Sequence, residues 1–359
     1  MDGLLLDVTP ATLLRATLMF LGFFAAQFLF ALLLPGKRET GFATPSGEVL
    51  TYKLNGLAAF LLTPALLLVW CLAFDGSLTP VLSHFWSLLI VANVFVAVAL
   101  TSLMVRGRAG RSDSLLHDLW FGRELNPALL GVDLKMFFYQ PSLIGLFVIV
   151  MAFAWRQHEL YGALTPQMIL FVGFWWLYLL THYIRESFML STWDILAEKF
   201  GFMLVWGDTV YVPFFYSICG WWLIDYRASW SIAAVIGLAA LHFAGHYVFR
   251  TSNWQKDDFK RDPNALIWGQ PPQTIGKLLV SGWWGIGRHL NYTGEIIVYL
   301  CFALCTGFQS VIPYVLPLAL VVLLSQRAAR DDRRCRAKYG ALWDQYCETA
   351  RFRMVPFIY

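Results

Sequence analysis

Residues 81–105 read VLSHFWSLLIVANVFVAVALTSLMV, a run that contains no Asp, Glu, Lys or Arg. An α-helix needs about 20 consecutive apolar residues to cross the hydrocarbon core of a bilayer. A run of this length and composition therefore predicts a membrane-spanning helix, and this pattern decides the class of the protein.

Similar runs recur along the chain. The candidate spans are 12–34, 54–74, 81–105, 141–155, 165–184, 203–224, 229–249, 293–308 and 311–326. A tenth, broken element is expected at 278–290, where apolar residues mix with Arg288 and His289. The composition agrees, because only 14% of the residues are charged, whereas soluble domains average about 25%. The sequence predicts an all-α polytopic integral membrane protein with about nine or ten spans and a single domain over 1–359.

Basic residues concentrate in three polar stretches, at 106–135, at 250–288 and after residue 326. Four predicted spans separate the first stretch from the second, and two separate the second from the third. Because both numbers are even, all three stretches are expected on one side of the membrane. Cytoplasmic loops carry an excess of Lys and Arg, so this side, with the C-terminus, is predicted to be cytoplasmic.

Residues 1–105 are almost uniformly hydrophobic, whereas ionisable residues gather in 106–359. Tyr178, His182 and Glu186 are spaced four apart and share one face of a helix, and Asp208 lies within an apolar run. Ionisable groups at membrane depth are costly and usually face a cavity or a bundle interior. These four are therefore candidate catalytic residues, with a structural interhelical hydrogen bond as the alternative for each.

Two classes of partner are not expected. The net charge of +4 is too small to indicate nucleic acid. His242 and His246, four apart, could hold a metal or haem, but the seven His are scattered and no carboxylate cluster accompanies the pair. We therefore predict no metal site.

The segment 250–292 interleaves bases with Trp and Tyr, and the tail after residue 326 adds further Arg and Lys. Cationic side chains bind phosphates, and flat aromatic rings can stack on a base or a nicotinamide. A dinucleotide with a 2′-phosphate satisfies both requirements, whereas contact with anionic lipid explains only the charges. Gly285-Ile286-Gly287 is an isolated motif among aromatic residues, so a Rossmann domain is not indicated.

Several blocks, in order over roughly 115–359, resemble the sterol reductase family. The longest, 278–295, is similar to the family signature L-L-x-S-G-W-W-G-x-x-R-H-x-N-Y-x-G-D, and the others are 122–127 with 133–135, 201–217, 327–331, 335–340 and 353–359. The family contains Δ14-, Δ7- and Δ24(28)-sterol reductases and the membrane part of lamin B receptor. Departures include Glu295 for Asp, Leu290 for Pro, Lys260 for Arg, and Thr181 for an acid.

The resemblance implies a membrane enzyme that uses NADPH to saturate a sterol carbon–carbon double bond. It implies that the C-terminal half forms the cofactor and sterol pockets, with Tyr178 at the sterol end. By matching positions, the implied NADPH contacts are Lys256, Lys260, Leu279, Trp284, Asn291, Arg327, Arg330, Asp331, Tyr339 and Tyr346. The chain is most similar to a Δ14-sterol reductase.

An isolated alkene does not accept hydride directly, so we expect protonation of one alkene carbon before hydride transfer. A buried Tyr or carboxylic acid can donate the proton, and the order of preference is Tyr178, Glu186 and then Asp208. His182 would relay or polarise. The sterol would enter laterally from the lipid bilayer, and NADPH from the cytoplasm.

Two other functions stay open at this point. Prenylcysteine-type membrane methyltransferases share a related Arg-His-Pro-x-Tyr-x-Gly region and use S-adenosylmethionine, which carries no phosphate. The absence of the acid at Thr181 also allows a non-catalytic sterol-binding protein. A bacterial inner membrane and the endoplasmic reticulum both suit a multi-pass protein of this kind.

Overall fold

The computed structural model describes residues 8–355 and 358, which form two compact units, Met1–Arg227 and Ala228–Tyr359. The described residues are mainly helical, with three two-stranded antiparallel hairpins, which confirms the all-α prediction. Pro356 and Tyr359, from the last block of the resemblance, lie outside the described residues.

The first unit contains most of the long helices and two of the hairpins. Its elements are α1 (Pro10–Leu33), β1 (Lys37–Thr40), β2 (Thr51–Leu54), α2 (Gly56–Ala73), α3 (Thr79–Ser83), α4 (Phe85–Arg106), η2 (Arg108–Gly110), α5 (Leu115–Phe121), β3 (Ala128–Leu129), β4 (Val132–Asp133), α6 (Leu134–Tyr161), α7 (Pro166–Ile184), η3 (Glu186–Ser191), α8 (Trp193–Leu196), α9 (Phe202–Trp206), η4 (Gly207–Phe215) and α10 (Gly220–Asp225).

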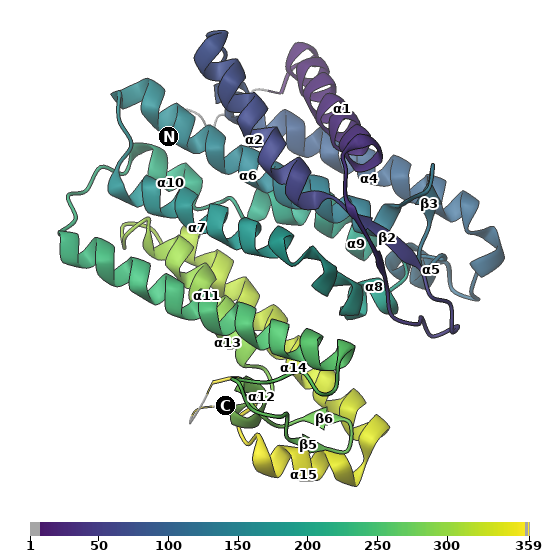
Figure 1. Cartoon of the computed structure of the whole chain (residues 1–359). Helices are drawn as coiled ribbons and strands as arrows, with labels where there is room; N and C mark the ends of the chain where they lie inside the picture. Colours follow the sequence, from purple (N-terminus) through teal and green to yellow (C-terminus); the bar gives the residue numbers. More distant parts are fainter. Residues whose placement is uncertain (1–7, 356–357, 359) are drawn as a thin grey trace. The chain divides into compact units, whose positions relative to one another are not determined.

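Helix α6 is the centre of this unit. It packs against α1, α2, α7, α10 and η4, and 72% of its apolar window is buried, more than in any other described span. Figure 1 shows α2 and α7 beside it. The Asp133 side chain caps its first turn by accepting from the Met136 amide, and Gly162 ends it in the left-handed conformation, as expected of helix caps.

The element η4 is a nine-residue π-helix that continues directly from α9. It contains Pro213, which has no amide hydrogen to donate. π-helical turns are rare and often occur at functional sites. This one carries Asp208 in its first turn and packs against α6 and α4.

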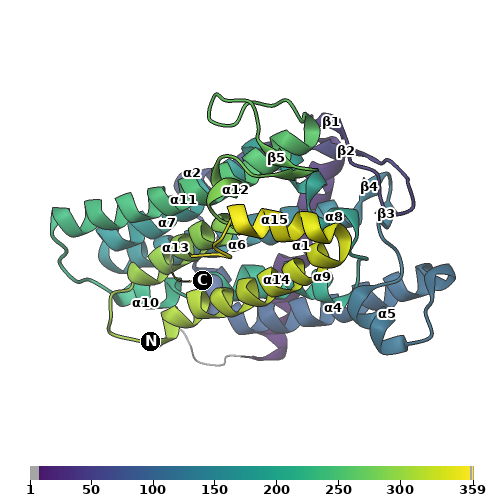
Figure 2. The same ribbon diagram turned by 90° about the horizontal axis from the view of Figure 1, so that it is seen from below.

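The second unit consists of three longer helices, α11, α13 and α14, and a compact group of short elements, β5, β6, α12 and α15, which we call the cap. Its elements are α11 (Ile232–Arg261), β5 (Thr274–Ile275), β6 (Leu278–Leu279), α12 (Trp283–Ile286), α13 (Leu290–Leu304), η5 (Ile312–Tyr314), α14 (Val315–Tyr339) and α15 (Ala341–Thr349). Helix α13 packs against both α11 and α14, and α15 turns back against α14 (Figure 2).

Glycines bring α11 and α13 into close contact. A Cβ added at Gly294 would lie 2.5 Å from the Phe249 amide nitrogen, and one at Gly245 would lie 2.6 Å from Ile297 Cγ2. The contacts pair rising numbers on α11 with falling numbers on α13, so the two helices are antiparallel. This packing fixes the end of α11 beside the start of α13.

Eight helical segments of the described chain are long and apolar enough to cross a membrane, which confirms a multi-pass membrane protein. They correspond to all the predicted spans except 293–308, which matches the 15-residue helix α13. That helix rises only about 22 Å. The prediction of a broken span at 278–290 was wrong, because this segment forms only β6 and the four-residue α12.

Candidate functional site

All ten predicted cofactor residues lie in the second unit, around the end of α11 and the cap. Lys256 and Lys260 are on the last turns of α11, Leu279 on β6, Trp284 on α12, Asn291 on α13, Tyr346 on α15, and Arg327, Arg330, Asp331 and Tyr339 on α14. The structure thus gathers residues that are up to 90 positions apart in the sequence.

Trp284 is the hub of this cluster. Its indole Nε1 donates to the Ser252 carbonyl (2.9 Å), and the Lys256 ammonium lies 4.5 Å from the centre of its ring. The Tyr346 hydroxyl donates to the Trp284 carbonyl (3.3 Å), and the Leu279 side chain packs in the same buried cluster as the Trp284 ring. Burial raises the pKa of Tyr346 above its usual value. A cation fixed over an indole is an arrangement suited to an anionic, aromatic ligand.

Asp331 meets the same cluster from α14. One of its carboxylate oxygens is 3.9 Å from His289 Nε2, and it interacts electrostatically with Lys260. Burial, with a smaller contribution from the Lys256 charge, lowers the pKa of His289 to about 3. The imidazole is therefore neutral at pH 7, and it stacks on Tyr292 with ring centres 4.9 Å apart.

Asn291 offers an unused acceptor. Its amide nitrogen donates to Asn253 Oδ1 (3.1 Å) across the α11–α13 contact, while its Oδ1 is buried without a hydrogen-bond partner among the described residues. Buried polar atoms are almost always satisfied. An acceptor left open at the edge of a basic, aromatic cluster fits a ligand with an N–H or O–H donor.

The remaining predicted contacts extend the cluster along α14. Arg327 and Arg330 precede Asp331 by four and one positions, which puts Arg327 and Asp331 on one helix face. Tyr339 packs against the buried pair Trp343 and Tyr346. These positions suit phosphate binding by guanidinium groups, which can form paired hydrogen bonds.

Sequence reasoning did not identify the residues that hold this cluster in place. Gln255 Oε1 accepts from the Trp283 amide (3.0 Å), and a Cβ at Gly282 would lie 2.4 Å from the same oxygen. The Arg288 amide donates to the Phe352 carbonyl (2.9 Å), and Thr293 Oγ1 donates to the Met354 carbonyl (2.7 Å). A polar Gln255 on the inner face of α11 was the available signal.

The four predicted catalytic residues lie in the first unit. Tyr178 and His182 are both buried on α7, and the His182 ring packs edge-on against Tyr183 and Phe188. The Thr181 hydroxyl, which replaces the family acid, donates to the Leu177 carbonyl (2.8 Å). The Thr181 hydroxyl therefore forms a hydrogen bond within its own helix.

Glu186 is the first residue of η3, beyond the end of α7 at Ile184, so the prediction that it shares a helix face with Tyr178 and His182 was wrong. It lies against Gly56, the first residue of α2. Its carboxylate accepts from the Gly56 amide (3.0 Å), and a Cβ at Gly56 would be 2.6 Å from its Oε1. Burial raises the pKa of Glu186 to about 7, although the bond from Gly56 acts in the opposite direction. A carboxylic acid with this pKa can donate a proton near neutral pH.

Asp208 and Glu186 face different cavities of the first unit. Asp208 lines an apolar cavity of about 500 Å³, and Glu186 lines a second cavity of about 490 Å³ beside the two hairpins, with more polar residues in its lining. Tyr178 and His182 are not among the described residues that line either cavity. The structure therefore does not gather the four candidates around a single one of these two spaces.

Comparison with known protein families gives the same assignment as the sequence blocks at 115–359. The profile of the "Ergosterol biosynthesis ERG4/ERG24 family" matches residues 11–359. The chain belongs to this family. The match confirms the resemblance and extends it to the first hundred residues, where the sequence offered only a compatible hydropathy pattern.

Several known proteins that the chain resembles carry reductase names. The chain is 38% identical to the Delta(14)-sterol reductase of Arabidopsis thaliana, over 91% of each chain. It is also 38% identical to the Delta(14)-sterol reductase of Methylotuvimicrobium alcaliphilum, covering 94% of this chain and 83% of that one. The 7-dehydrocholesterol reductase of Xenopus laevis is 31% identical, over 98% of this chain and 82% of that protein.

Proposed function

We propose that this protein uses NADPH to reduce a carbon–carbon double bond of a sterol, with the Δ14 bond preferred. The observation that carries the proposal is the cluster in which Lys256 covers Trp284 beside Lys260, Asp331 and Tyr346. Family membership supports sterol reduction. The preference for Δ14 is supported by the higher identity to the Delta(14)-sterol reductases than to the 7-dehydrocholesterol reductase.

The residues of the second unit fit the proposed cofactor. Lys256, Lys260, Arg327 and Arg330 would neutralise its phosphates, and Trp284 with Tyr346 would bound its rings. Asn291 Oδ1 is buried and has no hydrogen-bond partner among the described residues. It would accept a hydrogen bond from an amide or a ribose hydroxyl of the cofactor. When bound, NADPH supplies the hydride.

In the proposed reaction, an acid of this chain first protonates one alkene carbon, and the more substituted carbon then accepts the hydride. Two C–H bonds replace the π bond. The proposed donors remain Tyr178, Glu186 and Asp208, in that order, with His182 relaying or polarising. The raised pKa of Glu186 supports its place in this series. The sterol would enter from the bilayer, and the cofactor from the cytoplasmic side, where the C-terminus would also lie.

The test is turnover by the purified full-length protein in detergent. A Δ8,14-diene sterol is supplied with NADPH or NADH, and the sterols are analysed by mass spectrometry. We expect a product with two additional hydrogen atoms, formed with NADPH in strong preference to NADH. The same assay with Δ7 and Δ24(28) sterols tests the position of the double bond.

Two results would replace the proposal. Thermal stabilisation by NADPH without turnover of any of these alkenes would favour a non-catalytic sterol-binding protein. Stabilisation by S-adenosylmethionine but not by NADPH would favour a methyltransferase. The match to the ERG4/ERG24 family argues against that outcome.

A further inference from the structure

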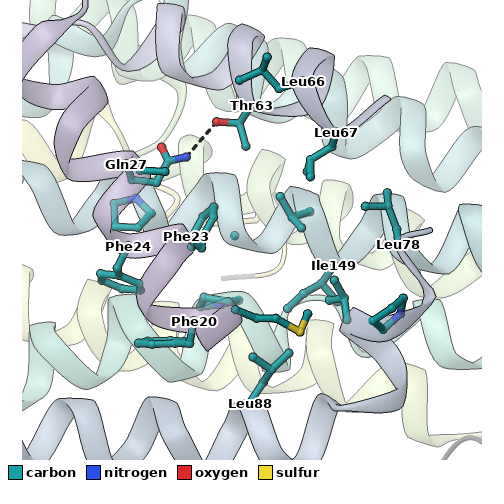
Figure 3. Close-up of a pocket in the computed structure, with 18 of the residues that line it drawn as sticks. Phe20, Phe23, Phe24, Gln27, Thr63, Leu66, Leu67, Leu78, Leu88 and Ile149 are labelled. Carbon is teal, nitrogen blue, oxygen red and sulfur yellow. Dashed lines mark hydrogen bonds between the residues drawn. The ribbon is translucent and has the colours of Figure 1, made fainter. Parts of the chain in front are cut away.

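The two cavities of the first unit differ in chemical character. The apolar cavity is lined mainly by aromatic and aliphatic side chains, and its Gln27 donates to Thr63 (2.9 Å; dashed line in Figure 3). The second cavity, of about 490 Å³, has the size of a usual site for a small ligand. We call it the hairpin cavity, because both hairpins of this unit contribute to its lining. Its ionisable and amide residues are Arg38, Tyr52, Lys53, Asn55, Asn126, Asp133, Gln140 and Glu186.

The hairpin cavity lies at one end of three long helices. Ala31 and Leu32 come from the last turn of α1, and Asn55 immediately precedes α2. Asp133 caps the first turn of α6. All three helices are long and apolar enough to cross a bilayer. The ends of such helices lie where the hydrocarbon core meets the lipid headgroups, so the cavity is at headgroup depth.

Two bases of the lining face each other across the β1–β2 hairpin. Arg38 and Lys53 are direct partners in its register, and both are exposed. Residues opposite each other in an antiparallel pair lie on the same side of the ladder, where like charges repel. Neither base forms an ion pair with an acid among the described residues. An anion bound between the two would turn this repulsion into attraction.

Lys53 keeps a donor for such an anion. Its ammonium donates to the carbonyl groups of Ala31 (3.3 Å) and Leu32 (2.9 Å). An ammonium has three donors, so one remains. These bonds hold the ammonium at the end of α1, and the Arg38 guanidinium adds its own N–H groups. Together they form a cationic pair suited to a phosphate.

Two acids line the same cavity. Glu186 accepts from the Gly56 amide (3.0 Å). Asp133 accepts from the Met136 amide (2.8 Å) and from Asn126 Nδ2 (3.1 Å). Neither acid is joined to a base by an ion pair among the described residues. The two acids balance the two bases of the lining, so a ligand that carries both signs of charge fits better than a purely anionic one.

One part of the rim is apolar. Leu130, in the turn between β3 and β4, lines the cavity and is 75% exposed, and its neighbour Leu129 is 45% exposed. The Leu130 backbone has a φ of 51°, in the left-handed region that bulky residues rarely occupy. An exposed leucine held in this way at headgroup depth is suited to contact with the acyl chains of a lipid.

We propose that the hairpin cavity binds the headgroup of a phospholipid that carries a primary amine, such as phosphatidylethanolamine. The lipid phosphate lies between Arg38 and Lys53. The ammonium faces Asp133 and Glu186, and the acyl chains leave past Leu130.

The spacing of the charges agrees with this headgroup. Its phosphate and its ammonium are joined by a bridge of only two carbons. Lys53 precedes Gly56, the partner of Glu186, by three positions, so their Cα atoms are at most about 11 Å apart. The basic and acidic groups are thus close enough for one small zwitterion. None of the ten predicted cofactor residues belongs to this unit.

The test is lipid binding to the purified, delipidated full-length protein in detergent, measured by native mass spectrometry. The probes are dioleoyl phosphatidylethanolamine, phosphatidylcholine and phosphatidylglycerol. Choline keeps the positive charge but has no N–H to donate, and glycerol has no positive charge. We expect the first ethanolamine lipid to bind about tenfold more tightly than the other two. Equal affinities would overturn the proposal. Because neither cofactor nor sterol is present, the result is independent of the reductase proposal.

Inorganic phosphate distinguishes a lipid from a free anion as the source of the phosphate. We expect added inorganic phosphate to leave the binding of phosphatidylethanolamine unchanged, since it has neither an ammonium for the acids nor acyl chains for the apolar rim. Displacement of the lipid by inorganic phosphate would show a site for free anions and would overturn the proposal.

Arg38→Met tests the phosphate contact. Lys37→Met is the matched control, because it removes the same charge from the same strand, and Lys37 is not in the described lining. We expect Arg38→Met to weaken binding of phosphatidylethanolamine about tenfold, and Lys37→Met to leave it unchanged. Equal binding by the two variants, whether lowered or not, would overturn the role of Arg38.

Asp133→Asn tests the ammonium contact. Asparagine caps helices as well as aspartate does, so α6 keeps its cap, and the melting temperature verifies the fold. With Glu186 as the remaining acid, the preference for phosphatidylethanolamine over phosphatidylcholine should fall about threefold, as expected for the loss of one partly exposed ion pair. An undiminished preference would overturn the placement of the ammonium.

Discussion

The two longest helices of the molecule, α6 with 28 residues and α11 with 30, have different roles. Helix α6 is surrounded by other helices and has 72% of its apolar window buried, whereas the corresponding value for α11 is 28%. At 1.5 Å per residue α11 is about 45 Å long, which exceeds a hydrocarbon core of about 30 Å. Its last turns therefore carry Lys256 and Lys260 beyond the apolar layer.

This difference suggests a division of tasks between the units. The first unit holds polar groups such as Asp208 and Glu186 at two separate cavities. The second unit joins its polar and aromatic groups in a connected cluster around Trp284. Under the proposed function, changes in the first unit should alter the proton transfer and its pH dependence, and changes in the second should alter cofactor affinity.

The largest effect is expected from Tyr178→Phe, which removes only the hydroxyl. If Tyr178 donates the proton, kcat should fall by about 10²–10⁴-fold. The affinity for NADPH, measured by thermal stabilisation, should stay at the wild-type value. A wild-type kcat would remove Tyr178 from the mechanism and leave Glu186 as the next donor to test.

Glu186→Gln should change how stability depends on pH. Because burial raises the pKa of Glu186 to about 7, its ionisation destabilises the fold, and stability is lost as pH rises from about 4.5 through about 7. At about 1.4 kcal/mol per pH unit, the loss approaches about 3.5 kcal/mol. We expect the variant to match the wild type at pH 5 and to exceed its melting temperature at pH 8.

The turnover of Glu186→Gln gives an independent result. If the carboxylic acid donates the proton, wild-type kcat falls above pH 7, and the variant is slow at every pH. A variant that keeps the wild-type pH–rate profile would show that Glu186 acts only on stability, through its contact with Gly56.

Lys256→Met should affect the cofactor and spare the chemistry. The substitution keeps an apolar stem over Trp284 but removes the charge. A hydrogen bond to a charged group is worth about 1.5–3 kcal/mol, so KM for NADPH should rise by roughly 10- to 150-fold, with little change in kcat. Lys277→Met, at an exposed lysine between β5 and β6, is the control. An equal rise in both variants would indicate a general effect of charge.

The smallest effect is expected from Gly294→Ala, which presses α13 away from α11. The added methyl group would approach the Phe249 backbone to 2.5 Å, and overpacking of this kind costs about 1–3 kcal/mol. Thermal unfolding should occur at lower temperature, and the stabilisation by NADPH should weaken. Gly173→Ala on α7, where nothing lies within 4 Å, should not destabilise.

The sequence was sufficient for the spans and for naming residues that gather around Trp284, for different reasons. An apolar run has only one stable arrangement across a bilayer, so hydropathy alone located α1, α2, α4 and α7. The ends of α6 were missed because polar residues continue the helix on both sides of its apolar centre. Lys256 and Trp284 were found by resemblance, although their direct contact needed the structure.

The cavity of the first unit could not be predicted in this way. Asp208 was recognised as an unusual residue, but hydropathy does not tell which faces of α1 and α2 meet. The π-helix also has no simple sequence signature. Gln27 in the middle of an apolar run was the one local sign that residues 1–105 contain more than uniform hydrophobic helices.

The contacts between the start of α13 and the last described residues have a consequence for biosynthesis. Thr293 and its partner Met354 are 61 positions apart, and Arg288 and Ala350 are 62 apart. A chain still attached to the ribosome cannot form these bonds until residues 350–354 have emerged from it. The second unit would therefore acquire its complete form only after the whole stretch from α11 to Met354 has left the ribosome.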